Sequence, residues 1–164
     1  MSAGEPYGLR PAGLVALDTL RIEAGLPLYG KELTEETTPY EAGLSRIVKL
    51  DKDSFVGQAA LRRQRTEGFS RTLVGLVIKD GVPPAGCELY WLSERAGRVT
   101  SSMKSALLGT NIAMALLDRK LAGEEGQELS LTIRNKPVKA VIVPLPFYNR
   151  HLHATLQSGS ESFH

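Results

Sequence analysis

From Arg71 onward the sequence alternates between short apolar runs and turn signals, and this alternation constrains the fold more than any other feature. Each run holds about five to eight residues rich in Val, Ile, Leu and aromatic side chains, as strands do. The runs are RTLVGLVIKDG, CELYWLS, GRVTSS, QELSLTIR and KPVKAVIVPL. The turn signals between them are DG at 80–81, PP at 83–84, AG at 96–97 and RNK at 134–136. Such spacing favours a small antiparallel barrel or sandwich.

The stretch LLGTNIAMALLDRKLAG, at 107–123, lies between these runs and is ambiguous. A continuous apolar run is compatible with a buried strand and with a buried helix. We expect a strand over 111–118.

The segment RPAGLVALDTLRIEAG predicts an amphipathic helix over 11–24. Pro11 suits the first turn, where its missing N–H is not needed, and Gly25 suits the end. The apolar residues recur at three- and four-residue spacing, and they are Leu14, Leu17, Leu20 and Ala24.

Three further elements are expected before residue 70. Thr38 and Glu41 have the spacing of a capping box, and a short helical turn should follow and end near Gly43. SRIVKL, at 45–50, predicts a short strand, and FVGQAALRRQRTEG, at 55–68, predicts a helix. We interpret the basic residues within 60–71 as a solvated helix face and its exit turn.

The composition excludes several classes of protein. The chain has 164 residues, 42% of them hydrophobic. No apolar run approaches the ~18 residues that span a bilayer. Its 20 basic and 18 acidic residues are interspersed, so we expect neither membrane nor nucleic acid as a partner. The N-terminus lacks the features of a secretory signal and the single Cys87 cannot form an internal disulfide, so the expected compartment is cytoplasmic.

The polar stretch HLHATLQSGSESFH, at 151–164, is expected to be a flexible tail. Its His151 and His153 fall short of the three or four ligands of a metal site, so we expect no metal. Cys87 has no positive neighbour in sequence that would lower its pKa, and we expect no nucleophilic role for it.

Three strings, taken in order, resemble the aminomethyltransferase (T protein) of the glycine cleavage system and its folate-dependent relatives. They are PAGLVALDTLRIEAGLPLYGKELTEETTPYEAGLSRIVKLDKDSFVGQAAL, GRVTSS and LPFY. The resemblance runs from about Gly8 to Arg150. An ordered series of this kind is more specific than a single motif.

The resemblance implies an α+β fold, in which the C-terminal end of a folate-binding α/β body is followed by a small antiparallel β-barrel. Residues 1–70 would be a remnant of the folate-binding domain, 71–150 the barrel domain and 151–164 the tail. It also implies that the family's catalytic aspartate lies in a first half that this chain lacks. We therefore expect no catalytic residue within it.

The activity that the resemblance implies for the complete enzyme is transfer of a one-carbon unit to tetrahydrofolate, from an aminomethyl group on the lipoyl arm of a carrier protein. This chemistry needs a carboxylate that manages protons and an apolar slot that excludes water. A lipoylated carrier protein is the expected partner. The alternative is a stand-alone β-barrel module that binds a partner and catalyses nothing. The apolar helix at 11–24 also predicts self-association, or pairing with a partner that takes the place of the first half.

The resemblance points to two cofactor-binding residues, Tyr29 and Arg150. In LPLYG, Pro27 and Gly30 set the backbone so that the phenol of Tyr29 can be held at the edge of a cleft. The alternative is a tyrosine that packs in its loop with its hydroxyl bonded to backbone. Arg150 matches a C-terminal arginine that family members direct toward the ligand, or else it is a charge at the edge of the tail.

One departure from the family concerns Leu17, where the family usually has an arginine that contacts folate. Leucine cannot make the planar, bidentate contact of a guanidinium, so we expect this chain alone to bind tetrahydrofolate weakly or not at all. Asp18 keeps the family's aspartate position. It either orients a neighbouring group or forms a salt bridge with Arg21.

Overall fold

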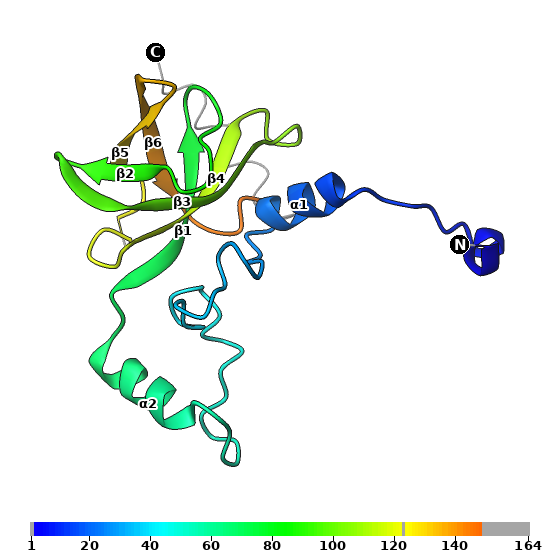
Figure 1. Cartoon of the computed structure of the whole chain (residues 1–164), viewed down its shortest axis with the longest axis horizontal. Coiled ribbons are helices and arrows are strands. Elements are labelled where there is room, and N and C mark those ends of the chain that lie inside the picture. Colours follow the sequence, from blue (N-terminus) through cyan, green and yellow to red (C-terminus); the bar gives the residue numbers. More distant parts are fainter. Residues whose placement is uncertain (1, 123, 149–164) are drawn as a thin grey trace.

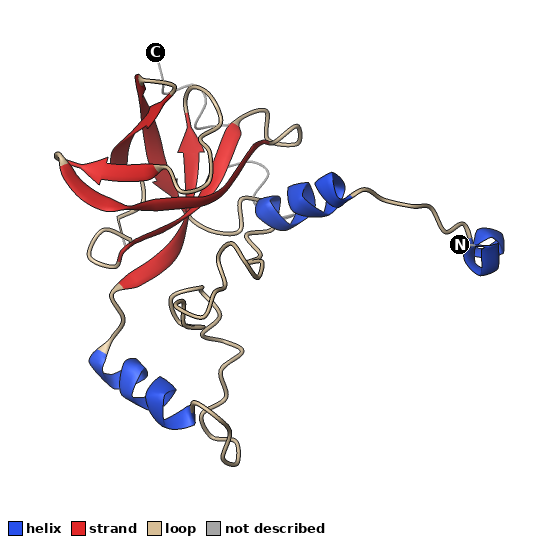
Figure 2. Cartoon of the chain, viewed as in Figure 1, coloured by secondary structure: helices blue, strands red, loops and turns tan. Residues whose placement is uncertain are grey.

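The computed structural model describes residues 2–122 and 124–148, so the expected tail at 151–164 lies outside the described residues. Six strands form a barrel, with helices outside it (Figures 1 and 2). The elements are η1 Ser2–Tyr7, α1 Leu14–Glu23, α2 Gln58–Glu67, β1 Arg71–Ile78, β2 Glu88–Trp91, β3 Glu94–Lys104, β4 Asn111–Asp118, β5 Glu128–Ile133 and β6 Lys136–Val143. Among the described residues, no helix combines the length and the apolar character that crossing a membrane requires.

The barrel closes in the strand order β1-β4-β3-β2-β5-β6, and all its pairings are antiparallel. β1 pairs with β4 along its whole length, from Arg71 opposite Asp118 to Ile78 opposite Asn111. Its other edge pairs with β6, which closes the sheet on itself. The predicted α+β class with a small antiparallel barrel is confirmed.

β4 is buried on both faces, which explains why its sequence is a continuous apolar run. Its inward side chains belong to the barrel core, and they are Ala113, Ala115 and Leu117. Its outward side chains Ile112 and Met114 pack in a second cluster with Ile22 of α1 and with Phe147. The strand expected over 111–118 is confirmed.

The pairing of β3 with β4 is irregular at Thr100. Val99 lies opposite Ala115 and Ser101 lies opposite Met114, so β3 carries one extra residue here, which is a β-bulge. Val99 and Ala115 face the barrel core, whereas Met114 faces outward. The bulge therefore turns Ser101 to the outer surface, because regular alternation would have placed it inside with Val99.

The chain reverses between β2 and β3 at Leu92 and Ser93, and the turn predicted at Ala96-Gly97 is wrong. Ala96 and Gly97 both lie within β3. A Cβ atom at Gly97 would collide with the carbonyl oxygen of Leu116 on the neighbouring strand. The glycine at 97 is therefore explained by close approach of two backbones, and not by chain reversal.

Leu92 and Ser93 have positive φ angles of 46° and 71°. A left-handed backbone crowds the Cβ atom of a leucine, whereas an Asn-Gly pair is favoured in two-residue hairpin turns. The double variant Leu92→Asn with Ser93→Gly should therefore raise the free energy of unfolding by about 1 kcal/mol. Urea denaturation followed by circular dichroism measures this, and an unchanged midpoint would contradict it.

α1 lies within the predicted range and is terminated by the predicted Gly25, just after the C-cap Ala24, but it begins at Leu14, so Pro11 lies before the helix and not in its first turn. The N–H of Leu26 donates to the carbonyl of Arg21, and the N–H of Gly25 donates to that of Ile22. These two bonds form a Schellman motif, which needs a left-handed residue at Gly25, and its φ is 64°. The helix end read from the sequence is thus correct.

The capping box at Thr38 and Glu41 is confirmed. The N–H of Thr38 donates to the Glu41 carboxylate at 3.1 Å, and the N–H of Glu41 donates to the Thr38 hydroxyl at 3.4 Å. Arg71 forms an ion pair with the same carboxylate at 3.1 Å, which joins this turn to the start of β1. Burial raises the pKa of Glu41, but its bonds with Arg71 and Thr38 outweigh burial and lower the pKa below its ordinary value.

The strand predicted over 45–50 is wrong, because this segment forms turns and Ile47 is 70% exposed. A strand needs a partner for its backbone groups, and the closed barrel offers it no free edge. The helix predicted within 55–68 is confirmed as α2. α2 buries none of its residues and lies apart from the barrel (Figure 1), which agrees with a solvated basic face.

Candidate functional site

Tyr29 lies in a tight loop that follows α1. The carbonyl of Leu28 accepts the N–H groups of three loop residues, namely Lys31, Glu32 and Leu33. The N–H of Gly30 donates to the carbonyl of Leu33, and its φ of 85° suits glycine. The side chain of Tyr29 is 74% exposed. A loop with a fixed backbone therefore presents the phenol to solvent.

Glu32 lies beneath this loop and is fully buried. Its Oε2 accepts the N–H of Leu28 at 3.0 Å and Nη1 of Arg21 at 2.8 Å. Its Oε1 accepts the hydroxyl of Ser101 at 2.5 Å. Nη2 of Arg21 donates to the same hydroxyl at 2.7 Å. We call Arg21, Glu32 and Ser101 the buried ionic triad, and it joins α1, the Tyr29 loop and β3.

Asp18 extends the triad toward solvent. Nε of Arg21 lies 2.6 Å from its Oδ1, and Nζ of Lys31 lies 3.3 Å from its Oδ2. Burial raises the pKa of Asp18, but the bonds and charges of Arg21 and Lys31 outweigh burial and lower the pKa below its ordinary value. Of the two roles expected for Asp18, the salt bridge with Arg21 is the one observed.

A second buried carboxylate fastens α1 to the barrel. The hydroxyl of Ser105, just after β3, donates to Oε1 of Glu23 at 2.5 Å. The carbonyl of Glu23 accepts the N–H of Tyr148 at 3.0 Å. The last turn of α1 is thus held between the end of β3 and the segment that follows β6.

The structure describes only part of the site that the sequence predicts. Tyr29 and Leu17 are both exposed, Leu17 by 54%. Arg150 lies outside the described residues. Sequence reasoning missed Glu32, and it included Ser101 only as part of the string GRVTSS, without a role. The opposite charges of Arg21 and Glu32 could have suggested a pair, but nothing local indicates that Ser101 faces them, because a bulge decides the direction of its side chain.

The N-terminal region leaves many large apolar side chains exposed. On α1, Leu14 is 84% exposed and Leu20 is 67% exposed, and with Leu17 they form what we call the apolar face of α1. The helix instead buries three residues of its last turn, namely Arg21, Ile22 and Glu23. Soluble monomers rarely leave an extended apolar patch uncovered.

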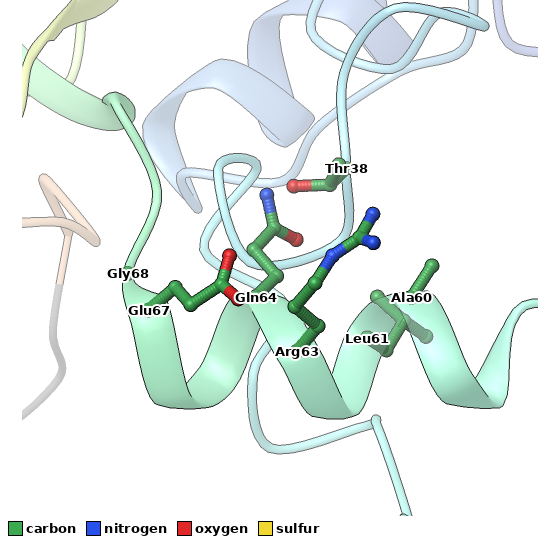
Figure 3. A pocket seen from close by; sticks show the side chains of 7 residues that line it. All are labelled: Thr38, Ala60, Leu61, Arg63, Gln64, Glu67 and Gly68. Atoms are coloured by element: carbon green, nitrogen blue, oxygen red, sulfur yellow. The ribbon is translucent and has the colours of Figure 1, made fainter.

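A hollow of about 270 Å³ lies between α2 and the turn at Thr38 (Figure 3). Its lining residues are Thr38, Ala60, Leu61, Arg63, Gln64, Glu67 and Gly68. Oε1 of Gln64 is buried and has no hydrogen-bond partner among the described residues. Neither Tyr29 nor Leu17 lines this hollow.

The environment of Cys87 agrees with the absence of a nucleophilic role. Burial raises the pKa of its thiol, the hydrogen bond with the carbonyl of Thr132 lowers it, and the negative charge of Glu88 raises it, with a net increase. A reactive thiolate requires the opposite shift.

Two family models match the chain. Residues 71–149 match the glycine cleavage T-protein C-terminal barrel domain, and residues 1–52 match the GCVT N-terminal domain.

Curated relatives and a solved structure agree with these matches. The chain is 49% identical to the aminomethyltransferase of Caldanaerobacter subterraneus subsp. tengcongensis, over 92% of this chain and 40% of the relative. It is 46% identical to that of Bacillus subtilis, over 92% of this chain and 42% of the relative. The crystal structure of glycine cleavage system aminomethyltransferase T from Bartonella henselae superposes with a TM-score of 0.78 at 33% identity, covering 84% of this chain and 39% of that one. The chain thus spans about two fifths of the length of the curated relatives it matches.

Proposed function

The chain belongs to the glycine cleavage T-protein family, and on that premise we propose that it acts as the C-terminal part of an aminomethyltransferase. The complete enzyme would transfer a one-carbon unit from an aminomethyl-lipoyl carrier protein to tetrahydrofolate, with release of ammonia. Residues 1–70 would belong to the folate-binding domain and 71–150 would form the barrel domain. The proposed compartment is the cytoplasm, in keeping with a single cysteine.

The observation that carries this proposal is the exposed phenol of Tyr29 on a loop with a fixed backbone. A solvent-exposed aromatic ring that a rigid scaffold positions is typical of a ligand contact. The resemblance of the sequence assigns a folate-contacting tyrosine to this position. Tyr29 would then form part of one wall of an apolar slot that keeps water from the reacting one-carbon unit.

The described residues fit the ring system of a folate better than its acidic tail. Tyr29 offers an aromatic ring, and Leu17 and Leu28 offer exposed aliphatic surface on the same segment. Both cations of the segment 14–33 are engaged, because Arg21 is paired with Glu32 and Lys31 with Asp18. The tail would need a further cation, and Arg150 is the proposed one.

Fluorine NMR on the intact chain tests this role of Tyr29. Fluorotyrosine is incorporated throughout, and the Tyr29→Phe variant assigns the Tyr29 resonance. Titration with tetrahydrofolate to millimolar concentration should shift that resonance and leave those of Tyr40 and Tyr90 unchanged. A Tyr29 resonance that does not move over the whole titration would rule out the proposed contact.

We expect the affinity of this chain alone for tetrahydrofolate to be weaker than micromolar. Each lost charged or bidentate hydrogen bond removes ~1.5 to 3 kcal/mol of binding free energy, and Leu17 supplies none. The Leu17→Arg variant should tighten binding by about tenfold or more, because a guanidinium supplies the charged, bidentate contact that leucine lacks. Isothermal calorimetry measures both, and micromolar binding by the unmodified chain would contradict this expectation.

The apolar face of α1 favours a second role, in which the chain is a stand-alone module that binds a partner and catalyses nothing. We propose that the partner is a second copy of the chain, bound through Leu14 and Leu17. A contact of ~1,200 Å² in total would suffice for a specific dimer. Buried apolar surface contributes ~25 cal/mol per Å², which is enough for pairing at micromolar concentration.

Replacing Leu17 by arginine should shift the chain toward monomer, because a guanidinium without a partner would have to be desolvated in the interface. Sedimentation over a concentration series measures this. The matched control is Val56→Arg, which places the same charge at an exposed valine next to α2 and should leave the association unchanged. An unmodified chain that stays monomeric throughout would exclude self-association through this face.

A further inference from the structure

We infer that Glu32 is a positioning residue that fixes the Tyr29 loop, and that the barrel sets the position of Tyr29 through it. The position of the loop does not depend on a ligand, whereas any effect of Glu32 on folate binding rests on the role proposed above for Tyr29. The geometry that supports it involves Leu28, Arg21 and Ser101.

On the side of the loop, Glu32 binds Leu28, the residue whose carbonyl accepts most of the hydrogen bonds of the loop. Its Oε2 accepts the N–H of Leu28 at 3.0 Å. The carbonyl of Leu28 in turn accepts the N–H groups of Lys31, Glu32 and Leu33. One carboxylate oxygen therefore anchors the peptide unit next to Tyr29, and the loop closes around that anchor.

On the side of the barrel, the other carboxylate oxygen is held by Ser101. The hydroxyl donates to Oε1 of Glu32 at 2.5 Å. Ser101 faces outward because of the bulge at Thr100, whose own hydroxyl donates to the carbonyl of Met114. Bulges often redirect a side chain in this way. Without the bulge, Ser101 would face the barrel core and Glu32 would lose its contact with the barrel.

The buried ionic triad is almost inaccessible to solvent, which indicates that it fixes the position of the loop and does not mainly add stability. Glu32 is 0% exposed, Ser101 is 2% exposed and Arg21 is 6% exposed. Apolar side chains of similar volume often stabilise a protein as well as a buried ion pair does or better, because removing charges from water is costly. What an ion pair adds is direction, because each oxygen of Glu32 accepts from donors at fixed places. The triad therefore specifies where the loop lies.

Amide hydrogen exchange on the intact chain tests the inference. The amides that close the loop are those of Gly30, Lys31 and Leu33. In Ser101→Ala they should exchange about tenfold faster, because the loop then opens while the barrel stays closed. Exchange in β4 should change less than about twofold. Glu32→Gln keeps the shape of the side chain and removes its charge, while Arg21 stays paired with Asp18, so it should show the same pattern.

The matched control is Ser102→Ala. Ser102 neighbours Ser101 on β3, but its hydroxyl donates to the carbonyl of Pro83 and not to the loop. This variant also loses a hydroxyl from β3 and should leave loop exchange unchanged. Faster exchange throughout the chain in Ser101→Ala, or no change in the loop, would overturn the inference. A loop that opens equally in Ser102→Ala would overturn it as well.

A second readout follows Tyr29 itself. With fluorotyrosine in the chain, the Tyr29 resonance of Ser101→Ala should move toward the position of an unfolded chain, while the resonance of Tyr90 on β2 should stay in place. This readout separates the inference from the proposed function. Loop exchange and the Tyr29 resonance could both respond to Ser101→Ala while tetrahydrofolate shifts no resonance of the unmodified chain. In that case Glu32 positions Tyr29, and the proposed folate contact is wrong.

Discussion

Replacing Arg21 by alanine should lower the free energy of unfolding by about 3 to 5 kcal/mol, because the substitution leaves a buried carboxylate without its cation. Glu32 is fully buried, and Arg21 is the only cation paired with it among the described residues. Urea denaturation followed by the fluorescence of Trp91, the single tryptophan of the sequence, measures the change.

Two control variants test whether an unpaired buried charge causes the loss of stability. Lys139→Ala removes the cation of a pair with Glu128 in which both side chains are more than half exposed, and it should leave stability nearly unchanged. The double variant Arg21→Met with Glu32→Leu should recover most of the stability, because it removes both charges from the interior. A double variant as unstable as Arg21→Ala would show that the unpaired buried charge does not cause the loss.

Replacing Leu117 by alanine should lower the free energy of unfolding by about 2 to 5 kcal/mol, through lost burial and the cavity that remains. Leu117 is fully buried in the barrel core. It lies opposite Gly97 on β3 and opposite Thr72 on β1, so the cavity would open inside the barrel, where the pairing of three strands limits how far the wall can close around it. The same urea denaturation measures the effect.

Leu107→Ala is the matched control for this core substitution. It removes the same atoms from a leucine that is half exposed in the turn between β3 and β4. Its cost should be well below that of Leu117→Ala, because little apolar surface is lost from burial. Equal losses in the two variants would contradict a stability that comes from the barrel core.

α1 and the barrel share one buried boundary, although they lie on either side of the proposed division at residue 70. Ile22 packs with Ile112 and Phe147, and Glu23 receives the hydroxyl of Ser105. The buried ionic triad adds a second connection. The Tyr29 loop is therefore attached to the barrel through side chains, and substitutions on β3 should change the amide exchange of the loop.

Local features of the sequence determined those elements whose causes lie within a few residues. The end of α1 follows from Gly25, because the Schellman motif requires a left-handed residue at that place. The capping box at Thr38 and Glu41 was read from their spacing for the same reason. The turn near Asn135 was also predictable, because the flanking runs are rich in β-branched residues and asparagine accepts a positive φ.

Only the tertiary structure decided the features that depend on distant partners. Ser101 bonds with Glu32 across 69 residues of sequence, and with Arg21 across 80. Its outward direction depends on a bulge that pairing with β4 imposes, and the segment 45–50 is not a strand because closed ladders leave it no partner. Local sequence cannot encode these outcomes, because each depends on which side chains and backbone edges the completed barrel leaves available.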